Sequence, residues 1–131
     1  MPFLTPLDVR LVCETETRCI WELLAPLEYE GYGYFVSVPV GFQTDFASIP
    51  RDYILWRRFG GRFNMEAVVH DYVYRKDSVP LLTKDEADRL LWQILMESGT
   101  YSRIFCNLVY DGVHLGGDSS YHKLNVGDKL C

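Results

Sequence analysis

The residues best suited to chemistry lie close together between positions 64 and 75. On a helix, His70, Asp71 and Tyr74 share one stripe about 100° wide, and most of the remaining positions carry apolar side chains. A helix that is apolar over most of its circumference is largely buried. The three polar side chains must then find hydrogen-bond partners, because a buried polar group without one costs about 1–3 kcal/mol.

The following helix offers a partner for the imidazole. Asp88 lies at the border of an apolar stripe that includes Leu91, and the short connection between the helices predicts antiparallel neighbours. Asp88 can therefore meet His70 across the helix interface. A carboxylate that accepts a hydrogen bond from one imidazole nitrogen leaves the other nitrogen as a base. The Tyr74 hydroxyl, one turn from His70, can hold the same carboxylate.

Two further carboxylates are candidate metal ligands. Asp71 points to one side of the His70–Asp88 pair, where it can bind a divalent cation beside an activated water. Asp45 is either a second ligand or the cap of a turn. Oxygen ligands alone favour calcium or magnesium, whereas His70 as a ligand makes zinc or manganese possible. The alternative is that the His–Asp–Tyr network is purely structural and ties two helices together.

A basic and aromatic segment at residues 51–63 is a candidate binding surface. It contains four arginines and four aromatic residues against one acidic residue, in a chain whose net charge is -5. Such a segment can bind phosphate groups or form a protein interface, where Arg, Trp and Tyr are enriched. It can equally be a solvated loop with buried aromatic rings. The candidate partner-binding residues are Arg51, Trp56, Arg57, Arg58 and Arg62.

The elements that position these residues indicate an α+β protein with a single domain over residues 1–131. Residues 1–50 form the β part: a hairpin from runs 9–12 and 19–24, a strand at 34–38, and an ordered loop at 39–51. Residues 64–114 form the helical part. It comprises a helix from Asn64 to about Arg75, one that begins at the capping box Thr83–Glu86 and ends at Gly99, and one over 101–114. Residues 115–131 are predicted to be an irregular tail, in which His122, like the nearby His114, is interpreted as incidental.

Composition excludes several classes of protein. With 131 residues and 48% hydrophobic residues, the chain can bury a core without metals or disulfides. No apolar run is long enough to cross a bilayer, and the N-terminus has no features of a signal peptide. An acidic chain is a poor general nucleic-acid binder. No nucleotide-binding glycine motif is present, so no organic cofactor is expected.

The four cysteines do not predict a disulfide scaffold. No Cys-x-x-Cys pair occurs, so a thiolate zinc site is not supported. The preferred interpretation is four free thiols in a reducing cytoplasm. The alternative is a bridge between Cys13 and Cys19, which can face each other across the predicted hairpin.

Three sequence blocks resemble a phage and prophage family that is catalogued as domain of unknown function 1353. They are PVGFQTDFASIPR at 39–51, AVVHDYVYR at 67–75 and DEADRLLWQILMESG at 85–99. The family has no assigned reaction. The resemblance implies a bacteriophage or prophage origin.

A local resemblance concerns mechanism. Phospholipase A2 enzymes carry His-Asp-x-x-Tyr on one helix and an Asp on its antiparallel partner, and His70, Asp71, Tyr74 and Asp88 fit this pattern. The resemblance implies that His70 is the base for a water, that Asp88 and Tyr74 orient it, and that Asp71 is a calcium ligand. The glycine-rich calcium loop of those enzymes has two candidate equivalents, at 30–33 and 41–45, and their disulfides around the His are absent.

Two functions remain open from the sequence. The first is a small phage-encoded hydrolase that acts on a phospholipid or on a cell-envelope ester or amide, with a divalent cation at its site. The second is a non-enzymatic virion or assembly component that binds other phage proteins through residues 51–63. In both cases the protein is expected in the host cytoplasm or the assembled virion, and the sequence does not indicate an oligomeric state.

Overall fold

The computed structural model describes residues 3–14, 19–44, 64–99, 101–116 and 121–130. Within these ranges five strands come first: β1 (Val9–Glu14), β2 (Cys19–Leu23), β3 (Leu27–Gly31), β4 (Tyr34–Val38) and β5 (Gln43–Thr44). The described residues after them form three helices: α2 (Asn64–Val73), α3 (Lys84–Glu97) and α4 (Arg103–Gly116). Short antiparallel sheets followed by helices confirm the predicted α+β class.

The described strands form two small antiparallel sheets rather than one. Strands β1 and β2 form the predicted hairpin, and β5 joins β2 on its other side. The segment 39–51, predicted to be a loop, therefore contains a short strand at 43–44. Strand β3 was not predicted; it pairs with β4 in a register that places Gly31 opposite Tyr34. The two residues of the turn between them, Tyr32 and Gly33, both have positive φ, as a tight hairpin turn requires.

Helices α2 and α3 begin as the sequence predicts, whereas α4 begins at Arg103, two residues later than predicted. Helix α3 has a complete capping box: the Thr83 side chain accepts a hydrogen bond from the Glu86 backbone, and the Glu86 side chain accepts one from Thr83. Gly99 lies just after its C-terminal end with φ +68°, a left-handed conformation that favours glycine. Helix α4 ends at Gly116, two residues later than predicted.

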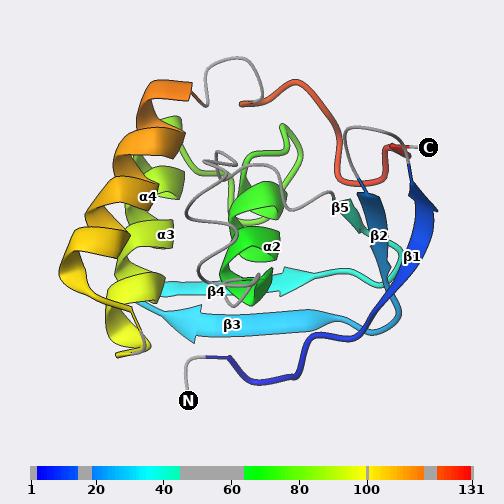
Figure 1. The fold of residues 1–131 in the computed structure, drawn as a ribbon. Coiled ribbons are helices and arrows are strands. Elements are labelled where there is room, and N and C mark those ends of the chain that lie inside the picture. Colours follow the sequence, from blue (N-terminus) through cyan, green and yellow to red (C-terminus); the bar gives the residue numbers. More distant parts are fainter. Residues whose placement is uncertain (1–2, 15–18, 45–63, 100, 117–120, 131) are drawn as a thin grey trace.

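Helix α2 occupies the centre of the molecule (Figure 1). Figure 1 shows α3 and α4 side by side along one flank, with the β3–β4 hairpin running beneath α2 and the β1–β2 hairpin on the opposite flank. The core is formed by buried side chains of all these parts, including Tyr29, Val36, Val69, Leu91 and Phe105. Because α2 is covered from several sides, most of its described side chains are buried, whereas Met65 and Asp71 are partly exposed.

The C-terminal segment 121–130 runs from the helices toward the β1–β2–β5 sheet (Figure 1). The backbone N–H of His122 donates to the carbonyl of Tyr74 at 2.8 Å. Farther along, the backbone N–H of Leu130 donates to the side chain of Gln43 at 2.8 Å. The predicted tail is therefore irregular but attached to the end of α2 and to β5.

The cysteine prediction needs a correction. Cys13 is disulfide-bonded, so the interpretation of four free thiols is wrong at this position. The spacing of Cys13 and Cys19 had left a bridge as the alternative, and the β1–β2 register places Glu14 opposite Cys19. Cys106 is a free, buried thiol. Among the described residues, no helix has the length and apolar character needed to span a bilayer.

Candidate functional site

The predicted contact between α2 and α3 is present. His70 Nε2 lies 2.8 Å from Asp88 Oδ1, and both side chains have no exposed surface. The imidazole stacks at an angle against the Tyr74 ring, with 4.2 Å between the ring centroids.

Asp88 is the centre of the hydrogen-bond network. The Tyr74 hydroxyl donates a short hydrogen bond to the same Oδ1 atom that His70 contacts. The other oxygen, Oδ2, accepts from Lys84 Nζ at 2.9 Å and lies 3.7 Å from His114 Nδ1. Lys84 also donates to the backbone carbonyl of His114 at 2.7 Å. One carboxylate thus connects α2, the first turn of α3 and the last turns of α4.

The surroundings keep Asp88 ionised. Burial acts to raise its pKa, but hydrogen bonds from His70, Tyr74 and Lys84 outweigh that effect, and the pKa lies below its usual value. A buried carboxylate is tolerated only when its oxygens accept several hydrogen bonds. Of these three hydrogen bonds, the one from His70 lowers the pKa of Asp88 most, followed by those from Tyr74 and Lys84.

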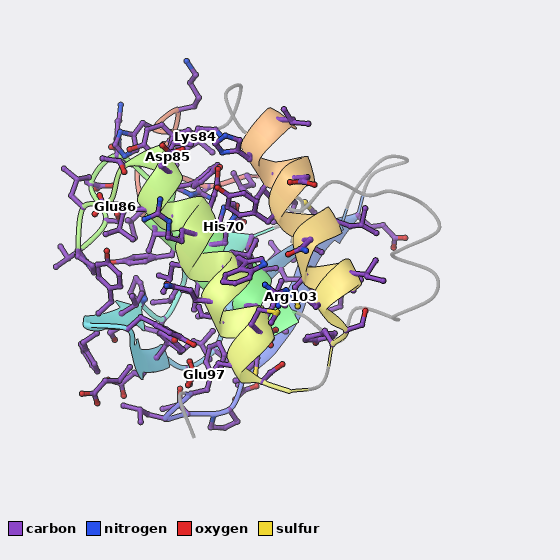
Figure 2. The ribbon with its side chains drawn as sticks, turned by 90° about the vertical axis from the view of Figure 1, so that its left-hand side faces the viewer. His70, Lys84, Asp85, Glu86, Glu97 and Arg103 are labelled. Carbon is purple, nitrogen blue, oxygen red and sulfur yellow. The ribbon has the colours of Figure 1, made fainter. Side chains whose placement is uncertain are left out.

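The second nitrogen of His70 is in a different situation. Nδ1 is buried and has no hydrogen-bond partner among the described residues. A neutral imidazole carries one proton, and an ionised Asp88 accepts it through Nε2. In this neutral tautomer Nδ1 presents a lone pair. Figure 2 shows His70 deep in the molecule beside α3, with Lys84 and Asp85 at the N-terminal end of that helix.

The predicted cation ligands are only partly described. The Thr44 hydroxyl of β5 donates a hydrogen bond to Asp71 Oδ2, so Asp71 lies against the end of the β1–β2–β5 sheet. Asp45 follows Thr44 directly in the chain but falls outside the described residues. Within the described ranges, no three His, Cys, Asp or Glu side chains gather as a metal site would require. Of the two loops considered for calcium, residues 30–33 instead include the turn of the β3–β4 hairpin.

All the predicted partner-binding residues also fall outside the described part of the chain: Arg51, Trp56, Arg57, Arg58 and Arg62.

Three polar residues of the site region were missed from the sequence. Lys84 lies four residues before Asp88, a helical spacing at which opposite charges meet. The contact between Lys84 and Asp88 could therefore have been predicted from the sequence. His114 reaches the pair only through the packing of α4 on α3, which no local pattern shows. Arg75 is buried; its guanidinium donates to the carbonyl of Gln43 at 3.2 Å and lies over the Phe42 ring.

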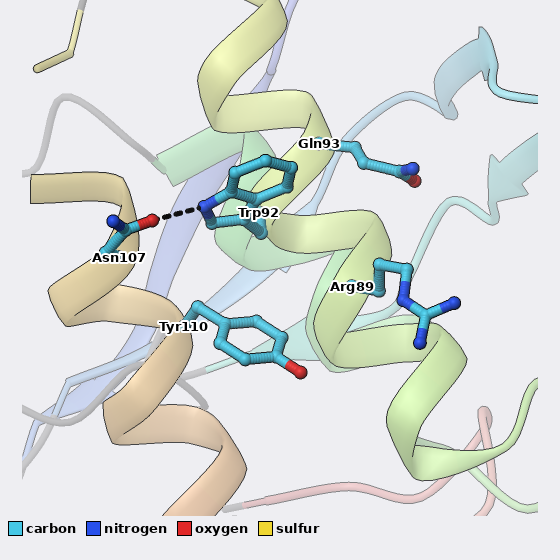
Figure 3. A pocket seen from close by; sticks show the side chains of 5 residues that line it. All are labelled: Arg89, Trp92, Gln93, Asn107 and Tyr110. Carbon is cyan, nitrogen blue, oxygen red and sulfur yellow. Dashed lines mark hydrogen bonds between the residues drawn. The ribbon is translucent and has the colours of Figure 1, made fainter. Parts of the chain in front are cut away.

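A groove of about 310 Å³ lies elsewhere, between α3 and α4. Figure 3 shows the hydrogen bond that closes one side of it, from Trp92 Nε1 to Asn107 Oδ1 at 2.8 Å. The groove is lined by Arg89, Trp92, Gln93, Asn107 and Tyr110. No residue of the predicted site lines it.

Comparison with known families gives one match. Residues 21–113 match the family described as "Protein of unknown function (DUF1353)". The chain belongs to the DUF1353 family. The matched region holds α2, α3 and most of α4, so the contact between His70 and Asp88 is part of the DUF1353 domain itself. No curated protein and no solved structure matches the chain.

Proposed function

We propose that this DUF1353 protein is a hydrolase in which His70 is the general base. The observation that carries the proposal is that only one of the two imidazole nitrogens has a hydrogen-bond partner among the described residues. Asp88 holds Nε2 at 2.8 Å, whereas Nδ1 has no partner among the described residues. A ring that only tied two helices together would gain stability from a partner at both nitrogens.

The chemistry follows from this arrangement. Nδ1 takes a proton from a water molecule as the water oxygen attacks a carbonyl carbon of the substrate. The resulting imidazolium is stabilised by the ionised Asp88, and it later returns the proton to the leaving alcohol or amine. Tyr74 and Lys84 hold the carboxylate in place, so they are positioning residues. Because His70 is buried, side chains around the ring must move before a substrate can reach Nδ1.

The substrate class and the cation come from the pattern His-Asp-x-x-Tyr with a second Asp. We propose a phospholipid, or an ester or amide of the cell envelope, as substrate, and a phage or prophage origin for the protein. A divalent cation, calcium first, would be held by Asp71 together with Asp45 and would polarise the carbonyl oxygen of the substrate. Of these two carboxylates only Asp71 lies among the described residues, where it accepts a hydrogen bond from Thr44, and no step above depends on the cation.

The test compares wild-type protein with His70→Gln. Glutamine can still donate a hydrogen bond to Asp88 but has no base at the position of Nδ1. Phospholipid vesicles and envelope ester substrates are tested in the presence of calcium and in the presence of EDTA, and we expect wild-type protein to hydrolyse one of them. We expect the rate of hydrolysis by His70→Gln to be lower by about 100-fold or more. Asp85→Asn, at an exposed position beside the network, is the matched control. Equal rates for wild type and His70→Gln would refute the proposal.

Burial favours a second candidate, a structural lock in a virion or assembly protein. His70 and Asp88 have no exposed side-chain surface, and four groups converge on one carboxylate. In that case the partner would be another phage protein, bound through residues 51–63. The lock predicts no hydrolysis by wild-type protein on any substrate of the panel, together with a large loss of stability in His70→Ala.

A further inference from the structure

Helix α2 carries a second buried polar group that the proposed reaction does not use. Glu66 is only 7% exposed, and its Oε2 atom has no hydrogen-bond partner among the described residues. His70 Nδ1 is likewise buried and without a hydrogen-bond partner among the described residues. The described part of α2 therefore presents two buried, unpartnered polar atoms.

The two atoms belong to neighbouring turns of one helix face. Glu66 precedes His70 by four residues, a spacing that places the two Cβ atoms about 5–6 Å apart. Helical side chains lean toward the N-terminus, so the His70 ring leans over the turn that holds Glu66. Side chains at this spacing can meet directly, but Glu66 Oε2 and His70 Nδ1 form no hydrogen bond with each other, so one small molecule can lie between the glutamate and the imidazole.

Native proteins satisfy nearly all their buried polar atoms. Where the chain supplies no partner, the usual one is a buried water with two to four polar neighbours. We propose that Glu66 Oε2 and His70 Nδ1 hold one water molecule between them, and that Glu66 is the positioning residue for the water that His70 activates. The catalytic half of this statement rests on the proposed function, whereas the water site does not.

The donor and acceptor chemistry matches a water. The lone pair of Nδ1 and the carboxylate of Glu66 are both acceptors, and a water has two O–H groups, one for each. Its oxygen lone pairs then point away from both side chains, as a nucleophile requires. Burial raises the pKa of Glu66 to about 7, against a smaller opposing effect of its own backbone N–H. Both forms of Glu66 can hold the water, because the acid form donates to its oxygen.

High-resolution crystal structures of wild type, Glu66→Gln and Glu66→Met test the water site. We expect an ordered water within hydrogen-bond distance of both atoms in wild type, a water retained in Glu66→Gln, and none in Glu66→Met. A wild-type structure with no water touching both atoms overturns the inference, as does a water that remains at Nδ1 in Glu66→Met. If Glu66→Met does not crystallise, magnetisation transfer between water and the isotope-labelled His70 ring gives the same comparison in solution.

Kinetics then separate the two parts of the proposal. On a substrate that wild type hydrolyses, Glu66→Met should lower kcat about tenfold or more with KM unchanged, and Glu66→Gln should restore most of the rate. Glu30→Met, at an exposed position on β3, is the control. A water that is present without any hydrolysis contradicts the proposed function alone. Hydrolysis that is lost in His70→Gln but unchanged in Glu66→Met contradicts the positioning role alone.

Discussion

The buried Glu66 makes the stability of the fold depend on pH in an unusual direction. Burial raises the pKa of this carboxyl from 4.5 to about 7 in the folded protein. Between these two values the folded state keeps a proton that the unfolded state releases. Folding therefore becomes less favourable as pH rises through this window, which is the opposite of the behaviour of a carboxylate held in an ion pair.

The magnitude follows from the two pKa values. They differ by about 2.5 pH units, and each unit corresponds to about 1.4 kcal/mol. Above pH 7, the ionised Glu66 should therefore lower the free energy of unfolding by about 3 kcal/mol compared with its value below pH 4.5. That is a sizeable part of the 5–15 kcal/mol that stabilises typical domains.

The assay is urea unfolding of wild type and Glu66→Gln at several pH values from 4.5 to 8. Glutamine has nearly the same shape but does not titrate, so the difference between the two proteins isolates Glu66 from every other titrating group. We expect wild type to lose about 3 kcal/mol relative to Glu66→Gln across this range. Glu30→Gln, at an exposed position, should follow the wild-type curve. If the free energy of unfolding changed with pH in the same way for wild type and Glu66→Gln, the Glu66 carboxyl would not be held in an apolar environment.

Three other predictions concern the helices. Asp88→Asn should lower the free energy of unfolding by about 3–5 kcal/mol in urea titrations, because it leaves Lys84 without its buried partner; a loss under 1 kcal/mol would mean that the network is not tightly formed. Thr83→Ala removes the cap of α3 and should cost about 1 kcal/mol, and an unchanged urea midpoint would contradict the capping geometry. Gly99→Ala should cost about 1 kcal/mol by thermal unfolding, because its φ is left-handed although space for a methyl group is open; a gain in melting temperature would contradict that backbone conformation.

The helical half of the protein could be predicted because helix caps and apolar spacing are local sequence patterns. The capping box at Thr83 and Glu86 and the glycine at position 99 fix where α3 starts and stops. The apolar spacing of α2 predicted its burial, and burial in turn required a partner for His70. The contact with Asp88 was therefore predictable as a consequence of where charge can be tolerated.

The β half was harder to predict because its strands pair with residues that are distant in the sequence. Strand β3 has the sequence LEYEG, in which two glutamates obscure the β character, although its alternating Leu27 and Tyr29 face the core. The short strand β5 exists only because β2 offers an edge for it. Likewise, His114 comes near Asp88 only when α4 packs on α3. Such pairings depend on tertiary packing, which no window of sequence contains.

The pKa values of the two carboxyl groups near His70, Asp88 and Glu66, are shifted in opposite directions. Asp88 accepts hydrogen bonds from three side chains and has a lowered pKa, whereas Glu66 has a raised one because burial is not offset by a side-chain donor. Two acids with separated pKa values can play different roles at one pH. A fold selected for stability alone has no reason to keep Glu66 buried, since a methionine would fill the same volume without the cost at neutral pH. If the proposed function is correct, the position of Glu66, one turn from Nδ1 of His70, gives that cost a functional reason.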